Sequence, residues 1–136
     1  MNYILDTDAW IAVLRWQNAG VLDRLKQTTP QCILLCSVVL AELWFGVEKS
    51  DPGRRAGNRQ LIEELEASYA SLAFDNDAAR AYASIRAHLS SLGQLIGPND
   101  LLIAAIARSH GATLITHNTT EFSRVPGLLV EDWQSA

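Results

Sequence analysis

Short apolar segments alternate with longer helical patterns along the whole chain, and this alternation is the strongest constraint on the fold. Apolar runs bounded by polar or turn residues predict strands at residues 3–5, 32–36, 113–116 and 128–130. Periodic apolar positions predict helices at residues 10–14, 21–26, 38–48, 61–72, 78–92 and 98–110. Because strands that alternate with helices pair in parallel through right-handed crossovers, we expect an α/β fold with a parallel sheet and helices on both faces.

The length of the chain predicts a single domain over residues 1–136, since two separate cores would leave each half marginally stable. Apolar residues make up 49% of the sequence, which excludes a disordered chain, while charged residues make up 19%, below the usual ~25%. With four Trp residues as well, we expect part of the surface to be covered by a partner or by a second copy of the chain.

The formal net charge of −4 excludes a protein-wide basic field that would hold nucleic acid nonspecifically. An RNA or DNA ligand would therefore need local contacts. One local candidate is a basic stretch that follows the predicted 38–48 helix, in what we expect to be a loop. Its members are Lys49, Arg54, Arg55 and Arg59. They predict either contacts to RNA phosphates or a solvated loop with salt bridges to Glu63 and Glu64.

The cysteines and the N-terminal residues both predict a cytoplasmic protein with no membrane association. Cys32 and Cys36 lie in one predicted strand, where they would be about 13 Å apart, too far for a disulfide. The first residues show neither a basic segment nor a sustained apolar stretch of the kind that signal peptides have. The longest apolar run, residues 32–41, is about half of the ~20 residues that span a membrane.

Two carboxylates stand in unusually apolar helices. Glu42 lies in a helix that is apolar on nearly every side, and Asp100 directly precedes the apolar residues 101–107. A buried carboxylate is costly unless it is paired, protonated or bound to a metal. Simpler interpretations exist: Glu42 at the rim of the helix would reach solvent, and Asp100 in a first turn would stabilise the helix dipole.

The predicted topology brings these carboxylates to one edge of the sheet. Asp6 follows the first strand, where a turn or helix-capping role is the simpler alternative for both Asp6 and Asp8. Asn118 and Glu121 follow the strand at residues 113–116, and a right-handed crossover turns the N-terminus of the Asp100 helix to the same edge. Ligands bind outside the carboxyl ends of parallel strands, so we expect a site there.

Converging carboxylates repel one another unless cations hold them, and hard oxygen ligands select Mg²⁺ or Mn²⁺. Zinc is disfavoured because His88, His110 and His117 have no paired spacing and the cysteines look like core residues. One or two such ions can activate a water and stabilise a leaving oxygen in phosphodiester cleavage. The predicted site would therefore suit a Mg²⁺ or Mn²⁺ ion, and phosphodiester cleavage is one reaction that such an ion supports.

Taken in order and spacing, several motifs resemble those of the PIN-domain ribonucleases of VapC type over essentially the whole chain. They are Ile-Leu-Asp-Thr-Asp (4–8), Ala-Glu-Leu (41–43), Gly-Val-Glu-Lys-Ser (46–50), Gly-Pro-Asn-Asp (97–100), Thr-His-Asn-Thr-Thr-Glu-Phe (116–122), Arg-Val-Pro-Gly-Leu (124–128) and Glu-Asp-Trp (131–133). The resemblance implies a three-layer α/β/α sandwich and a Mg²⁺- or Mn²⁺-dependent endoribonuclease. It also implies a homodimer, and a cognate antitoxin protein that blocks the toxin in a hetero-oligomer.

The same resemblance assigns Asp6, Glu42 and Asp100 to the acidic metal-site positions of the family. Asp8 departs from the family pattern, which usually has Asn there, so this carboxylate either joins the site or caps the following helix. The fourth acidic position is also open, because Asn118 stands where many members have Asp. We prefer Glu121 as the fourth catalytic and metal-binding residue, with Asn118 as a neutral ligand or supporting residue. A further predicted hydrogen-bond partner of a carboxylate or bound water is Thr116.

Two other functions compete with this interpretation. An aspartyl-phosphate phosphatase would use a motif like Asp6-Thr7-Asp8, but it needs a lysine near the site, and the two lysines, Lys26 and Lys49, follow no predicted strand. A non-catalytic PIN-like binding module would differ only in lacking activity with added metal. In relatives of this type, structured RNAs such as tRNA anticodon loops are common targets, and we expect such an RNA here.

Four aromatic residues in or near the first predicted helices have two possible roles. They are Trp10, Trp16, Trp44 and Phe45. They predict either core positions or a groove that receives the antitoxin or a second copy of the chain.

Overall fold

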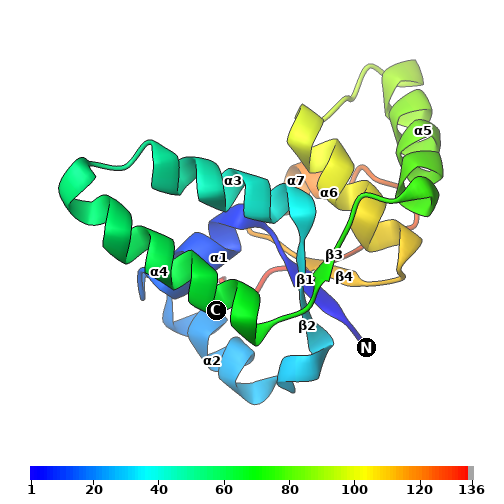
Figure 1. The fold of residues 1–136 in the computed structure, drawn as a ribbon. Coiled ribbons are helices and arrows are strands. Elements are labelled where there is room, and N and C mark those ends of the chain that lie inside the picture. The colour runs from blue at the N-terminus through cyan, green and yellow to red at the C-terminus, as the bar shows by residue number, and fades with distance from the viewer. Residues whose placement is uncertain (135–136) are drawn as a thin grey trace.

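The computed structural model describes residues 1–134 and shows five strands among seven α-helices and one 3₁₀ helix in that range (Figure 1). The strands are β1 (Tyr3–Leu5), β2 (Ile33–Cys36), β3 (Ser71–Leu72), β4 (Thr113–Ile115) and β5 (Leu129–Glu131). The helices are α1 (Thr7–Leu14), α2 (Ala19–Gln27), η1 (Pro30–Cys32), α3 (Ser37–Glu48), α4 (Pro52–Ser68), α5 (Asn76–Ser91), α6 (Pro98–Ser109) and α7 (Thr119–Phe122).

All five strands run parallel in the order β3-β2-β1-β4-β5, which confirms the predicted parallel sheet. Strand β1 is central and pairs with β2 on one side and β4 on the other. The strand order therefore reverses at β1, and the crevice outside its carboxyl end is where parallel α/β sheets bind ligands. Asp6 is the residue that follows β1.

The sheet is covered on both faces, which confirms the α/β/α architecture. Figure 1 shows α1, α2 and α4 on one side of the strands and α5 and α6 on the other. Helix α6 supplies much of the core, because its residues 103–107 are at most 1% exposed. Burial of apolar side chains from the strands and from α6 stabilises the layers, at roughly 25 cal/mol for each Å² removed from water.

Helix α4 differs from its prediction in both position and length. It begins at Pro52, so three of the four residues of the basic stretch lie in a helix and the predicted loop is wrong. Proline is tolerated at the first helical position, and the Asp51 carbonyl accepts hydrogen bonds from the backbone N–H groups of Arg54 and Arg55 at 2.9 and 3.1 Å. The helix ends at Ser68, and Leu72 lies in β3 instead of continuing the apolar stripe.

None of the described helices combines the length and the apolar character needed to cross a lipid bilayer.

Candidate active site

Asp6 is held between β1 and β4 at the carboxyl edge of the sheet. Its side chain is a buried N-cap, and its Oδ1 accepts a 2.9 Å hydrogen bond from the backbone N–H of Ala9. The hydroxyl of Thr116, a fully buried side chain, also hydrogen-bonds the carboxylate. Burial raises the pKa of Asp6 from 3.8 to about 6, although the hydrogen bonds from Thr116 and Ala9 act in the opposite direction.

Thr116 connects Asp6 to the short helix α7. Its backbone N–H continues the ladder by donating to the Glu131 carbonyl at 3.0 Å, and its hydroxyl accepts a 3.0 Å hydrogen bond from the backbone N–H of Asn118. Asn118 is the N-cap residue of α7, and its side-chain Nδ2 donates to Oε2 of Glu121 at 2.5 Å. A chain of hydrogen bonds therefore links Asp6 to the start of α7, while the Asn118 amide contacts Glu121.

Asp100 lies in the first turn of α6, where several carboxylates face it. The pKa of Asp100 is raised to about 6, first by burial and then by the negative charges of Glu121, Glu42, Asp6 and Asp8. These five acidic residues come from α1, α3, α6 and α7 and from the end of β1. The fold therefore brings all the sequence-predicted carboxylates within electrostatic reach of one another.

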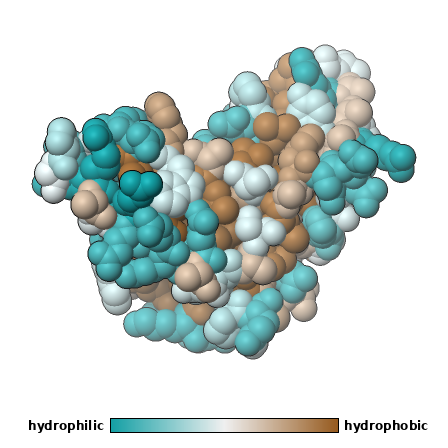
Figure 2. All heavy atoms as spheres, in the orientation of Figure 1, coloured by the Kyte–Doolittle hydropathy of each residue, from teal (hydrophilic) through white to brown (hydrophobic). Residues whose placement is uncertain are grey.

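Glu42 is fixed by a contact that joins α3 to α1. Its Oε1 accepts a 2.6 Å hydrogen bond from the Thr7 hydroxyl. Glu42 and Asp100 line one surface hollow together with Gly97, Pro98 and Asn99. In Figure 2 the molecule is notched between the lobe formed by α3 and α4 and the lobe formed by α5 and α6. The contact between Thr7 and Glu42 is not predicted from the sequence, because the two residues are 35 positions apart. The only sequence signal for Thr7 is its place in the Asp-Thr-Asp motif.

The carboxylates approach one another without forming a closed cage. Within residues 1–134, no three His, Cys, Asp or Glu side chains converge closely enough to hold one ion between them. Mg²⁺ usually keeps several waters and takes only one or two carboxylates from the protein. Asp6 and Asp100, both partly or fully buried oxygen donors in a region of uncompensated negative charge, fit that requirement.

The structure places the remaining predicted site residues at different distances from the carboxylates. Asp8 is exposed in the first turn of α1, and its charge contributes to the raised pKa values of both Asp6 and Asp100. Lys49 follows α3, seven residues beyond Glu42 or about 10 Å along a helix axis. Arg54, Arg55 and Arg59 lie still further along the chain, and Arg59 pairs with Glu63 at 3.2 Å. None of these four side chains lines the hollow that Glu42 and Asp100 share.

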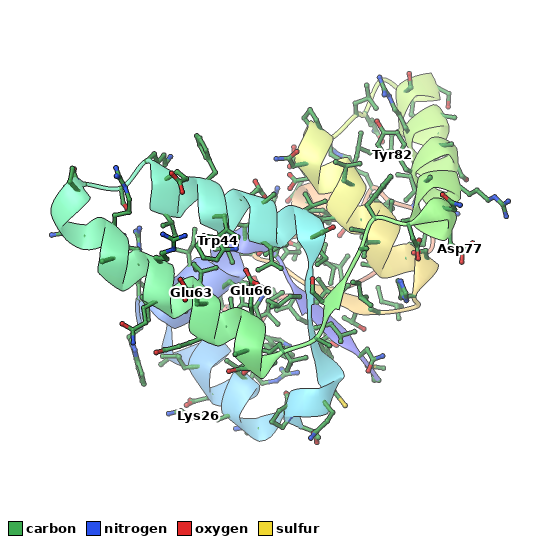
Figure 3. All side chains as sticks on the ribbon, in the orientation of Figure 1. Lys26, Trp44, Glu63, Glu66, Asp77 and Tyr82 are labelled. Carbon is green, nitrogen blue, oxygen red and sulfur yellow. The ribbon has the colours of Figure 1, made fainter. Side chains whose placement is uncertain are left out.

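The aromatic residues divide between the core and the surface. Trp10 is 1% exposed and packs against Tyr69, with ring centroids 5.3 Å apart. Figure 3 shows Trp44 of α3 facing Glu66 of α4, and the indole N–H donates to that carboxylate. By contrast, Trp16 and Phe45 are exposed at 73% and 64%.

A groove with an apolar floor runs between α1, α3 and α4. Its apolar residues are Ile11, Leu14, Leu43, Val47, Leu61 and Ile62. Glu42 also lines this groove, together with Arg15. The groove and the hollow beside Asp100 therefore share the Glu42 carboxylate.

Comparison with known proteins identifies relatives of nearly the same length. Residues 3–128 match the family described as PIN domain. The chain is 37% identical to Ribonuclease VapC2 of Haemophilus influenzae and 38% identical to the tRNA(fMet)-specific endonuclease VapC of Shigella flexneri, with 98% of each chain covered in both cases. Among solved structures, it is similar to DNA-bound VapBC from Salmonella typhimurium, with a TM-score of 0.90, 32% identity and 98% of both chains covered. VapBC2 from Rickettsia felis, bound to a promoter DNA fragment, gives a TM-score of 0.88 at 32% identity over 98% of this chain and 99% of that one.

Proposed function

The chain belongs to the PIN-domain family, and from this membership we propose that it is an endoribonuclease that needs Mg²⁺ or Mn²⁺ and acts as the toxin of a toxin–antitoxin pair. It hydrolyses RNA phosphodiester bonds. The observation that carries the metal dependence is the position of Asp100, whose pKa is raised by burial and by four other carboxylates at the carboxyl edge of the sheet. Such a cluster is costly without a cation and is suited to holding one.

Asp6 and Asp100 would hold the ion directly, with Glu42 and Glu121 completing the acidic site. When bound, a divalent ion supplies an activated water and neutralises charge on the phosphate. The protein contributes orientation: Thr116 and the Ala9 N–H fix the Asp6 carboxylate, and Thr7 fixes Glu42. Hydrogen-bonded supports of this kind set ligand direction and commonly change metal affinity by 10- to 100-fold when lost.

We assign the fourth acidic role to Glu121 because its charge is the largest carboxylate contribution to the raised pKa of Asp100. Asn118 supports Glu121 through its 2.5 Å hydrogen bond and is the alternative ligand. Asp8, which is exposed, adds negative charge from the first turn of α1.

A structured RNA is the proposed substrate, and a tRNA anticodon loop is the leading type of target. The Shigella flexneri relative is named for tRNA(fMet), and the net charge of −4 disfavours nonspecific binding to any RNA. Selection by shape is typical of proteins that recognise structured RNA.

The proposed inhibitor is a cognate antitoxin, as in the VapBC complexes that this chain resembles. The groove between α1, α3 and α4 offers an apolar floor beside the carboxylate of Glu42. An antitoxin segment with apolar side chains and a cationic residue matches both features. We also propose that the chain forms a homodimer, works in the cytoplasm and comprises one domain over residues 1–136.

The decisive experiment is cleavage of a total tRNA pool by the purified protein with Mn²⁺, with excess chelator, and with Asp100→Asn. We expect cleavage only by the wild type with metal. Full activity in chelator or in the variant contradicts the metal mechanism, and no cleavage under any condition favours the non-catalytic binding module. Induction in cells is expected to stop growth, with relief by the co-expressed antitoxin; harmless induction alone contradicts the toxin role.

The aspartyl-phosphate phosphatase gains no support from the placement of the lysines. Lys26 lies in the last turn of α2, on the side of the sheet opposite α6 (Figure 3). Lys49 is the C-cap residue of α3. Hydrolysis of p-nitrophenyl phosphate at a rate matching RNA cleavage would reverse this conclusion.

A further inference from the structure

His117 and Asp132 form a fixed pair at the same sheet edge as the carboxylates. The His117 ring nitrogen Nδ1 lies 3.0 Å from Oδ2 of Asp132. The other carboxylate oxygen, Oδ1, accepts a 2.8 Å hydrogen bond from the backbone N–H of Gln134. The His117 side chain is 64% exposed whereas that of Asp132 is 17% exposed. An exposed histidine that is nevertheless held by an anchored carboxylate is oriented toward solvent.

Strand register places this pair in one row with Asp6. Leu5 pairs with Ile115 and Ile115 pairs with Glu131, so the residues that follow, Asp6, Thr116 and Asp132, lie side by side. At ~4.8 Å between strands, Asp132 is about 10 Å from Asp6. Three stacked nucleotide steps, at ~3.4 Å each, cover that distance. An RNA that is cut beside Asp6 and Asp100 and runs along this edge toward β5 would therefore pass His117.

The carboxylate of Asp132 also determines which atom His117 presents. An ionised carboxylate only accepts hydrogen bonds, so the ring atom that faces it, Nδ1, carries a proton. In the neutral form of the imidazole, Nε2 is then an acceptor. Among residues 1–134, Nε2 has no protein partner. Phosphate oxygens are acceptors too, whereas the ribose 2′-hydroxyl is a backbone group of RNA that donates and that DNA lacks.

We propose that His117 binds a ribose 2′-hydroxyl near the scissile phosphate and thereby contributes to the selection of RNA over DNA, with Asp132 as its positioning residue. The proposal rests on the ribonuclease function proposed above and extends it to the sugar of the substrate. A purely structural pair, which would only close the ends of β4 and β5, is the alternative that the experiment must separate.

The test combines a protein change with a substrate change. The cut made by the wild type in tRNA is mapped, and an RNA hairpin around that cut is prepared with one 2′-deoxy sugar at each position in turn. His117→Ala is expected to lower kcat/KM on the all-ribose hairpin by about three- to tenfold, the worth of one neutral hydrogen bond. At the contacted position, the deoxy sugar is expected to slow the wild type by the same factor and to leave His117→Ala unchanged.

His110→Ala is the matched control, because His110 caps the end of α6 opposite to Asp100 and is exposed. It is expected to respond to every deoxy sugar as the wild type does. If the deoxy sugar slows His117→Ala by the same factor as the wild type at every position, the effects of the two changes are independent. The proposal is then wrong, and His117 has a structural role or contacts a phosphate. If the wild type cuts no RNA, the cut cannot be mapped, and it is the proposed ribonuclease function that is wrong.

Discussion

The hydroxyl of Thr7 donates a 2.6 Å hydrogen bond to Oε1 of Glu42, so the first turn of α1 holds an acidic residue of α3. Thr7 directly follows Asp6, and one short segment of chain therefore orients two of the four proposed metal-site carboxylates. This contact has no sequence spacing of its own, and it makes a side chain outside the acidic set important for the site.

The first prediction concerns this contact. Thr7→Val keeps the shape of the side chain and removes the donor, so Glu42 loses its orientation and Mn²⁺ affinity is expected to fall by about tenfold. Thr7→Ser keeps the hydroxyl and is expected to bind the ion nearly as the wild type does. Isothermal titration with Mn²⁺ measures both. Equal affinities for the valine and serine variants contradict a role for the hydrogen bond.

Asp100→Asn separates a functional carboxylate cluster from a structural one. Neutralising Asp100 removes repulsion from Glu121, Glu42, Asp6 and Asp8, so the metal-free variant is expected to melt at a higher temperature than the metal-free wild type. Mg²⁺ is expected to raise the wild-type melting temperature by mass action and to act less on the variant. An Asp100 that served only the helix dipole would lose about 0.3–1 kcal/mol as Asn, with no response to metal. Differential scanning calorimetry distinguishes the two patterns.

The raised pKa values of Asp6 and Asp100 predict a pH dependence of stability. Both folded-state values are about 6, against the ordinary 3.8, so the folded protein binds these protons more tightly than the unfolded chain does. Their contribution favours folding below about pH 4 and is lost as the pH rises through about 6. The metal-free wild type is therefore expected to lose melting temperature over this range more steeply than Asp100→Asn. If the melting temperatures of the two proteins change with pH in parallel, the raised pKa of Asp100 is contradicted.

Metal binding reverses this dependence, because ions compete with protons for the same oxygens. The gain in melting temperature from Mg²⁺ is expected to be small at about pH 5 and to grow above about pH 6. A gain that is unchanged by pH would place the ion away from Asp6 and Asp100.

The fourth acidic role is decided by comparing Glu121 with Asn118. Glu121→Gln removes a negative charge from the site and is expected to weaken Mn²⁺ binding by about tenfold or more, whereas Asn118→Ala removes only a supporting amide and is expected to cost less. Glu121→Gln is also expected to lower the pKa of Asp100, since the Glu121 charge raises it. Titrations in which Asn118→Ala has the larger effect would transfer the role to Asn118.

Strand β1 and helix α6 follow from local sequence signals. The apolar run before Asp6 and the stretch from Pro98 to Gly111 have clear boundaries, because Pro98 opens α6 and Gly111, with a φ of +62°, ends it. The short elements are different. Strand β3 has two residues and α7 has four, too few for the two-residue period of a strand or the 3.6-residue period of a helix to be recognised. Helix α4 begins at Pro52, and a proline is equally typical of a break between elements.

The candidate site also has features that can be predicted from the sequence and features that cannot. That Asp6, Glu42 and Asp100 meet is predictable from strand order, since the carboxyl ends of parallel strands share one edge. Their hydrogen-bond partners are not predictable, because Thr7 contacts Glu42 across 35 positions and His117 contacts Asp132 across 15. Such contacts depend on how the helices pack, which no local spacing encodes.

The central place of β1 has a consequence for synthesis of the chain. Asp6 is made among the first residues, but its neighbour β4 and its partner Thr116 come more than a hundred residues later, and Glu121 later still. A chain emerging from the ribosome can therefore pair β1 with β2 early, while the acidic centre stays incomplete until residues 113–121 have been translated. A product of premature termination before that point would lack Thr116 and Glu121, so the proposed acidic site becomes complete only when translation is nearly finished.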